Sequence, residues 1–120
     1  MKVLKTDRSH KDFYRWMGPV FGSREIEKKS RDRFYDDPGK VWYLLPGQAA
    51  ASVLGSTIKN FWADTEEDGT ALLKEICPEY ECLDGIVPLC YQESFEKMGF
   101  QCMGQYRNGQ EFFYLYRYRD

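Results

Sequence analysis

Hydrophobic positions change their spacing several times along the chain, and each spacing predicts a type of element. Apolar residues alternate with basic ones in "MKVLKT" (1–6), which predicts a short first strand. The runs "VWYLL" (41–45), "AAASVLGSTI" (49–58) and "NFWAD" (60–64) are rich in small, β-branched or aromatic residues and predict three more strands. A further strand is expected within "YECLDGIVPL" (80–89). Strands therefore dominate the middle of the chain.

The segment between the first two predicted strands has a helical spacing. Residues 9–29 predict two short helices, because Phe13, Trp16 and Met17 fall on one helical face. Ser9 with Asp12 three residues later is a capping arrangement for the first helix, and Ser23 is the expected cap of the second. Gly18-Pro19 predicts a break between the two helices.

The second half of the chain predicts two helices and a hairpin. One helix is expected over about 66–76, with Pro78 to stop it. Another is expected over 91–98, where Gly99 fits the C-terminal cap. Asn108-Gly109 lies between two β-rich runs and predicts a type I′ hairpin turn.

This order of elements predicts the fold class. Strand, two helices, strands, helix, strand, helix and hairpin indicate an α/β or α+β mixed sheet with helices on both faces. At 120 residues the chain is expected to form a single domain, residues 1–120, since domains typically have about 100–150 residues. The apolar fraction of 42% is sufficient for a hydrophobic core.

Charge and composition exclude several classes of function. The net charge of −2 and the absence of a basic stripe argue against a nucleic-acid partner. No apolar run has the length of a membrane span, and the N-terminus lacks a signal-peptide core, so a soluble, cytoplasmic protein is expected. No metal site is expected, because the cysteines form no C-x-x-C pair and the one histidine, His10, is far away. The cysteines are Cys77, Cys82, Cys90 and Cys102.

Several segments resemble one enzyme superfamily. "YLLPGQAAASVLGSTI", "GTALLKEI" and above all "SFEKMGF" (94–100), followed by a terminal hairpin, resemble the GNAT superfamily of acyl-CoA-dependent N-acyltransferases. The likeness covers nearly the whole chain in order. It implies transfer of an acetyl group from acetyl-CoA to an amine on a small molecule or a protein. The alternative is a GNAT-like fold without this chemistry, acting as a binding or inhibitory module through protein contacts.

The resemblance also implies where acetyl-CoA binds. In the family the cofactor lies between two central parallel strands, which correspond here to the strands near Asn60–Asp64 and Glu81–Leu89. Its pyrophosphate lies on backbone amides at the start of the following helix, here 65–71, where the helix dipole favours negative charge. The residues expected to contact the cofactor are Trp62, Ala63, Gly69, Thr70, Ala71, Ser94 and Phe95.

The predicted pyrophosphate loop departs from the family pattern Q/R-x-x-G-x-G/A. Asp64 stands at the Arg/Gln position and Glu67 at the first glycine, with Glu66 and Asp68 adding further negative charge. The same residues are also typical of a helix capped by Thr65 or Asp64, with acidic side chains in its first turn. Both interpretations, phosphate site and capped helix, remain open from the sequence.

Direct acetyl transfer needs an acid and a base. Phe95 occupies the position where the family often has a tyrosine acid, so Tyr91, one turn earlier, becomes the candidate acid. Asp64 is the candidate base, with Glu25 and Glu27 as alternatives.

The acceptor is expected to lie against the segment 13–27. The resemblance places the family's acceptor wall in this segment, and the candidate acceptor contacts are Trp16, Phe21, Arg24 and Glu25. The aromatic strand Phe112–Arg119 is expected to lie at a sheet edge, where pairing between two copies would give a homodimer.

Overall fold

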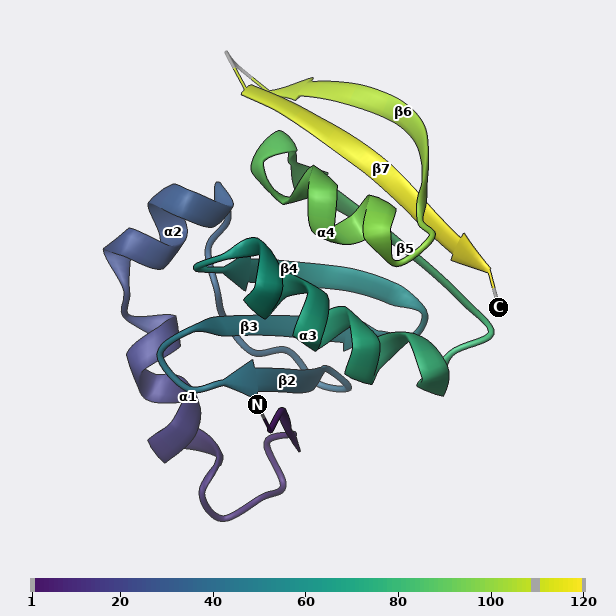
Figure 1. Cartoon of the computed structure of the whole chain (residues 1–120). Coiled ribbons are helices and arrows are strands. Elements are labelled where there is room, and N and C mark those ends of the chain that lie inside the picture. Colours follow the sequence, from purple (N-terminus) through teal and green to yellow (C-terminus); the bar gives the residue numbers. More distant parts are fainter. Residues whose placement is uncertain (1, 109–110, 120) are drawn as a thin grey trace.

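The computed structural model describes residues 2–108 and 111–119, with the side chains of 105–117 excepted. Four α-helices surround one seven-stranded sheet (Figure 1). The helices are α1 Phe13–Phe21, α2 Arg24–Ser30, α3 Glu66–Ile76 and α4 Gln92–Lys97. The strands are β1 Leu4–Thr6, β2 Val41–Leu45, β3 Ala49–Leu54, β4 Thr57–Ala63, β5 Cys82–Pro88, β6 Gln101–Asn108 and β7 Glu111–Arg119, and short 3₁₀ turns cover Cys77–Glu79 and Leu89–Tyr91.

The sheet is mixed, which confirms the predicted fold class. Its strand order is β1-β2-β3-β4-β5-β7-β6, and every neighbouring pair is antiparallel except β4 with β5. That parallel pair is joined at two positions only, Thr57 with Asp84 and Ile58 with Gly85. An added Cβ on Gly85 would lie 3.1 Å from the Cβ of Ile58, so glycine permits the close approach. Beyond these positions the two strands are no longer paired.

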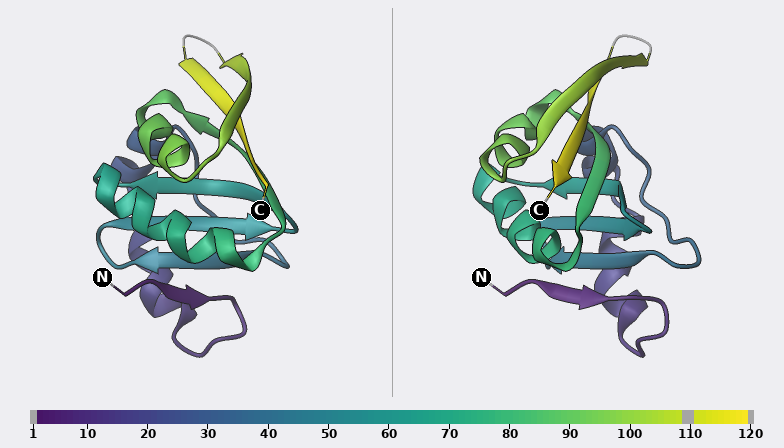
Figure 2. Two further views of the ribbon diagram at one scale, coloured as in Figure 1. Left: turned by 45° about the vertical axis from the view of Figure 1, so that its right-hand side comes forward. Right: turned by 90° about the vertical axis from the view of Figure 1, so that its right-hand side faces the viewer.

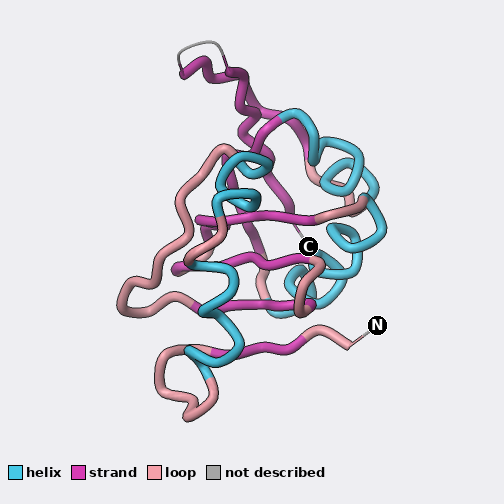
Figure 3. The backbone as a smooth tube through the Cα atoms, turned by 90° about the vertical axis from the view of Figure 1, so that its left-hand side faces the viewer, coloured by secondary structure: helices cyan, strands magenta, loops and turns pink. Residues whose placement is uncertain are grey.

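Helices cover both faces of the sheet, as predicted. The pair α1 and α2 lies on one face, and the pair α3 and α4 lies on the other (Figures 2 and 3). Each face has its own buried cluster. Phe13, Met17 and Ile26 pack against Trp42 and Trp62 on the first face; on the second, Leu72, Leu73, Ile76 and Phe95 pack against Tyr43, Ala51 and Phe61. None of the helices in the described residues is both long and apolar enough to cross a membrane.

The predicted strand 49–58 is interrupted by a turn. Gly55 has a φ of +65°, a left-handed conformation that favours glycine, and the chain reverses there into β4. β4 also carries a bulge, because Ser52 pairs with Asn60 while the next residue, Val53, pairs with Ile58. Lys59 is the extra residue, and bulges of this kind bend and twist a strand.

Two predictions about the first helix are wrong. α1 continues through the predicted break, with Pro19 inside its last turns, where Val20 still packs into the core. The proline removes one backbone donor near the end of a short helix, and burial of the apolar face compensates. Ser9 does not cap the helix. Its backbone N–H instead donates to Asp7 Oδ1 at 2.9 Å in the preceding turn, and the residue at the N-cap, Asp12, makes no side-chain capping bond.

Other local predictions are confirmed. Ser23 Oγ accepts from the N–H of Ile26 at 3.2 Å at the start of α2. α3 has the predicted bounds, and Gly99 has a φ of +92° directly after α4.

The C-terminal hairpin pairs as expected, although its turn residue Gly109 lies outside the described residues. The predicted edge position of Phe112–Arg119 is wrong, because β7 lies between β5 and β6. The edges of the described sheet are β1 and β6. A dimer formed by strand pairing would therefore use β1 or β6.

Candidate functional site

A cavity lies at the fork where β4 and β5 cease to pair. Its volume is about 580 Å³, and we call it the fork cavity. The first turn of α3, the end of α2 and the segment between β5 and α4 surround it. Fork points in open sheets are common ligand sites, because the strand ends leave backbone groups and space uncovered. The lining residues are Lys28, Lys29, Arg31, Ala63, Asp64, Thr65, Glu66, Pro88, Leu89, Cys90, Tyr91, Glu93 and Ser94.

Some of the predicted site residues meet at this cavity. Ala63 and Ser94 line it, together with both candidate catalytic residues, Tyr91 and Asp64. Phe95, by contrast, is fully buried against Phe61 and Phe100 in the core. Gly69, Thr70 and Ala71 are not among the lining residues, and Trp62 lies on the α1–α2 face.

Gly69 has a packing role that the sequence does not reveal. A Cβ added there would lie 2.7 Å from Ser94 Oγ and 3.3 Å from the Cβ of Ala63. Ser94 Oγ in turn donates to the carbonyl oxygen of Glu66 at 3.0 Å. The glycine thus lets α3 approach α4 closely and holds the first turn of α3 beside the cavity.

The start of α3 is both capped and partly open. Thr65 Oγ1 accepts from the N–H of Asp68 at 3.1 Å, so this amide is already used. The N–H groups of Glu66 and Glu67 make no hydrogen bond to the described residues. First-turn amides of this kind favour an anion through the helix dipole. Two donors therefore remain available to a phosphate.

The acidic side chains of this turn are turned mostly away from the cavity. Of the three, only Glu66 lines the fork cavity. Its carboxylate pairs with Lys97 of α4, whose ammonium holds the pKa of Glu66 below its usual value. Glu67 and Asp68 are outside the lining. The repulsion toward a bound phosphate is thus smaller than the sequence suggests.

Basic residues from the end of α2 form the opposite wall. Lys28, Lys29 and Arg31 balance the three acidic residues of the lining, Asp64, Glu66 and Glu93. Lys29 Nζ lies 2.7 Å from Asp64 Oδ1, and this contact raises the pKa of Lys29. The Asp64 side chain is 48% exposed. The candidate base Asp64 is therefore already paired with a lysine.

Tyr91 is a buried tyrosine in the lining of the fork cavity. The residue is only 6% exposed, its ring packs edge-on against Phe61, and its hydroxyl finds no hydrogen-bond partner of normal geometry in the described part of the chain. Burial raises the pKa of the phenol, and the backbone N–H of Ala63 opposes this only in part. The hydroxyl is therefore protonated at neutral pH, and its oxygen is buried.

The predicted acceptor residues are divided between core and surface. Trp16 stacks on His10 with ring centroids 4.7 Å apart, and Phe21 packs against Trp42 at 5.3 Å. Neither lines the fork cavity. Glu25 lines a smaller cavity of about 250 Å³ with Trp62 and Asp64, and Arg24 lines a shallow one of about 470 Å³ with Glu27 and Lys28.

A second cavity at the fork was not predicted from the sequence. It has a volume of about 320 Å³ and opens on the α2 side of β4 and β5; we call it the α2-face cavity. It shares Arg31 and Pro88 with the fork cavity. Its lining is Ser30, Arg31, Asp32, Ile58, Lys59, Asn60, Phe61, Ile86, Val87 and Pro88.

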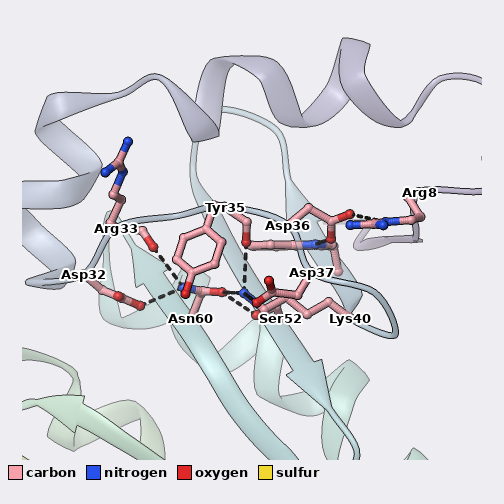
Figure 4. Close-up of polar contacts among 10 residues, drawn as sticks. Arg8, Asp32, Arg33, Tyr35, Asp36, Asp37, Lys40, Ser52 and Asn60 are labelled. Atoms are coloured by element: carbon pink, nitrogen blue, oxygen red, sulfur yellow. Dashed lines mark hydrogen bonds and ion pairs between the residues drawn. The ribbon is translucent and has the colours of Figure 1, made fainter.

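A buried polar network supports this second cavity (Figure 4). Asn60 Oδ1 accepts from Lys40 Nζ at 2.9 Å and from Ser52 Oγ at 2.6 Å. Its Nδ2 donates to Asp32 Oδ2 at 2.7 Å. Lys40 is 4% exposed and also donates to the carbonyl oxygen of Tyr35 at 2.9 Å. The network ties the segment after α2 to the sheet, and its trace in the sequence is the polar Asn60 within β4.

Comparison with known proteins adds no family. Neither the models of known protein families nor the curated proteins give a significant match to the chain. Among the described residues, no group of three or more His, Cys, Asp or Glu side chains is placed to hold a metal ion. The inference about function therefore rests on the geometry of the fork.

Proposed function

We propose that the protein is an acyl-CoA-dependent N-acyltransferase with a GNAT-like fold, which transfers an acetyl group from acetyl-CoA to an amine. The observation that carries the proposal is the fork: a parallel strand pair that separates after two residue pairs and opens into a cavity beside the first turn of a helix. The cytoplasmic location expected from the sequence belongs to the same proposal.

The residues around the cavity fit the parts of acetyl-CoA. The free N–H groups of Glu66 and Glu67 suit a pyrophosphate, and Lys28 supplies positive charge on the opposite wall. The protonated hydroxyl of Tyr91 suits a group that must donate a proton to a leaving thiolate. These contacts come from α3, from α2 and from the segment before α4, so the ligand would be held from three sides.

One observation favours the alternative function. Thr65 already satisfies the Asp68 amide, and the charges of the lining cancel, so a polyanion gains little from the field of the cavity. A non-catalytic module that binds a protein partner at the fork would have the same features. The two functions differ in whether acetyl-CoA binds.

Binding of acetyl-CoA is the direct test. Thermal unfolding is followed with acetyl-CoA, free CoA and 3′-dephospho-CoA. A ligand at about 100 times its Kd stabilises the folded state by roughly 2.7 kcal/mol. Cys90 is exposed and lines the fork cavity, whereas Cys82 is exposed but lies outside it. Cys90→Trp should therefore abolish the shift, and Cys82→Trp should keep it. No shift with the wild-type protein at millimolar acetyl-CoA would overturn the proposal in favour of the binding module.

A further inference from the structure

Asp32 is the one acidic residue that lines the α2-face cavity. It follows α2 directly, and its Oδ2 accepts from Asn60 Nδ2 at 2.7 Å. The orientation of that amide is determined, because Lys40 and Ser52 both donate to its oxygen and leave its nitrogen to face Asp32. A carboxylate has about four acceptor positions, so lone pairs remain for a ligand in the cavity.

The cavity beside Asp32 suits an amine with an apolar body. Ile58 and Phe61 of β4 and Ile86 and Val87 of β5 form its apolar walls, and Arg31 and Lys59 also line it. Because it shares Arg31 and Pro88 with the fork cavity, the two cavities adjoin. A donor bound in one cavity and an acceptor bound in the other would meet at the fork.

We propose that Asp32 is the base that takes the proton of the acceptor ammonium, and that the α2-face cavity holds the apolar body of that amine. This inference rests on the proposed acyltransferase function. The ammonium gives its proton to the Asp32 carboxylate, and the neutral nitrogen forms a bond to the acyl carbon. The carbon–sulfur bond breaks, the thiolate takes a proton from Tyr91, and the amide nitrogen releases its second proton to solvent. The Asp32 proton then passes through solvent to the Tyr91 phenolate, which restores both side chains and leaves one proton released overall.

The surroundings of Asp32 are compatible with this role. Burial raises the pKa of its carboxyl group, whereas hydrogen bonds from Asn60 and from the N–H of Arg33 oppose the rise. A raised pKa makes a carboxylate a better base at neutral pH. The charged groups that face it or line the cavities around it are Arg24, Glu27 and Lys28 of α2, Arg31 and Arg33 beside it, Lys40 below it, and Lys59 of β4.

Asp32→Asn tests the proposed role of Asp32 as the base. Asparagine retains the shape of the aspartate side chain and can still accept a hydrogen bond from Asn60 Nδ2. The matched control is Asp12→Asn, an acidic residue paired with Arg15 on α1. Acetyl transfer to hexylamine and 2-phenylethylamine is followed by mass spectrometry between pH 6 and pH 9, with putrescine as a doubly charged amine without a large apolar body. We expect Asp32→Asn to lower kcat/KM by about 10²–10⁴-fold. Its residual rate should rise about tenfold per pH unit as free amine forms, while its stabilisation by acetyl-CoA stays at the wild-type level.

Each of the other outcomes overturns one named part of the proposal. If the wild type transfers acetyl groups and Asp32→Asn does so with the same rate and pH profile, Asp32 is not the base, although the acyltransferase stands. Loss of the acetyl-CoA shift in Asp32→Asn would mean that the residue acts only through structure. A preference for putrescine over both apolar amines would overturn the proposed acceptor class. If the wild type neither binds acetyl-CoA nor transfers acetyl to any amine, the proposed function and this inference fail together.

Discussion

The two parts of the sheet are built differently. From β1 to β4 each strand pairs with the next one in sequence, and β3 and β4 are joined along their whole length. The part formed by β5, β7 and β6 is attached to β4 by only two residue pairs. Continuous pairing satisfies backbone groups and excludes ligands, whereas the early end of the β4–β5 pairing leaves backbone and space uncovered. The fork cavity and the α2-face cavity both lie at this junction.

The two sides of the junction also differ in polarity. The fork cavity has balanced charges from three elements, and the α2-face cavity combines apolar strand residues with Asp32, Arg31 and Lys59. Under the proposed function, the acyl donor occupies the first side and the apolar body of the amine occupies the second. Substitutions on each side should therefore have separable effects.

The largest effect is expected from the network under the α2-face cavity. Asn60→Leu would remove one hydrogen-bond partner each from the buried ammonium of Lys40, the hydroxyl of Ser52 and the carboxylate of Asp32. We expect a loss of about 3 kcal/mol in the free energy of unfolding, measured by urea denaturation. Lys59→Ala, a change at the exposed neighbour, should have almost no effect. A loss below about 1 kcal/mol for Asn60→Leu would show that the network rearranges at little cost.

The next effect concerns the opposite side of the sheet, where α3 meets α4. Gly69→Ala would place a Cβ against Ser94 and Ala63, and we expect about 1–3 kcal/mol of destabilisation from overpacking. Gly18→Ala in α1 meets nothing within 4 Å, so the higher helix propensity of alanine should leave that variant as stable as the wild type or up to about 1 kcal/mol more stable. The same chemical change should thus have opposite signs in the two helices. Equal thermal midpoints for both variants would contradict the close approach of α3 and α4.

A smaller effect is expected at the helix caps. Thr65→Ala and Ser23→Ala each remove a side-chain capping bond, at the start of α3 and α2 respectively, and each should cost about 1 kcal/mol. Only Thr65→Ala frees the Asp68 amide beside the fork cavity. We therefore expect tighter acetyl-CoA binding in Thr65→Ala and unchanged binding in Ser23→Ala, measured by calorimetry. Weaker binding in Thr65→Ala would assign the threonine itself to the ligand site.

The smallest effect is a pH-dependent change of stability at Asp32. Burial raises the pKa of this group above its unfolded value, so the folded protein prefers the protonated form. The contribution of the protonated Asp32 carboxyl to the free energy of unfolding is fully present below the unfolded pKa. It is lost as the pH rises through the folded pKa. Asp32→Asn should thus be at least as stable as the wild type at pH 7, and any advantage should disappear toward pH 3. A variant that is less stable than the wild type at pH 7 would mean that the ionised carboxylate stabilises the fold.

The sequence alone determined the features that depend on near neighbours. The bounds of α3 follow from a threonine cap and an apolar helical spacing, and the cap of α2 from Ser23, because each of these contacts spans three or four residues. Burial of an apolar face overrides local preference in α1, which continues past Pro19.

The tertiary structure alone decided the residues of the site. Asp32 and Asn60 are 28 positions apart, and they meet because the segment after α2 lies against β4. The fork itself exists because β4 and β5, separated by a whole helix, pair at two positions and no further. Such contacts depend on where distant segments pack, and no local pattern of residues records that choice.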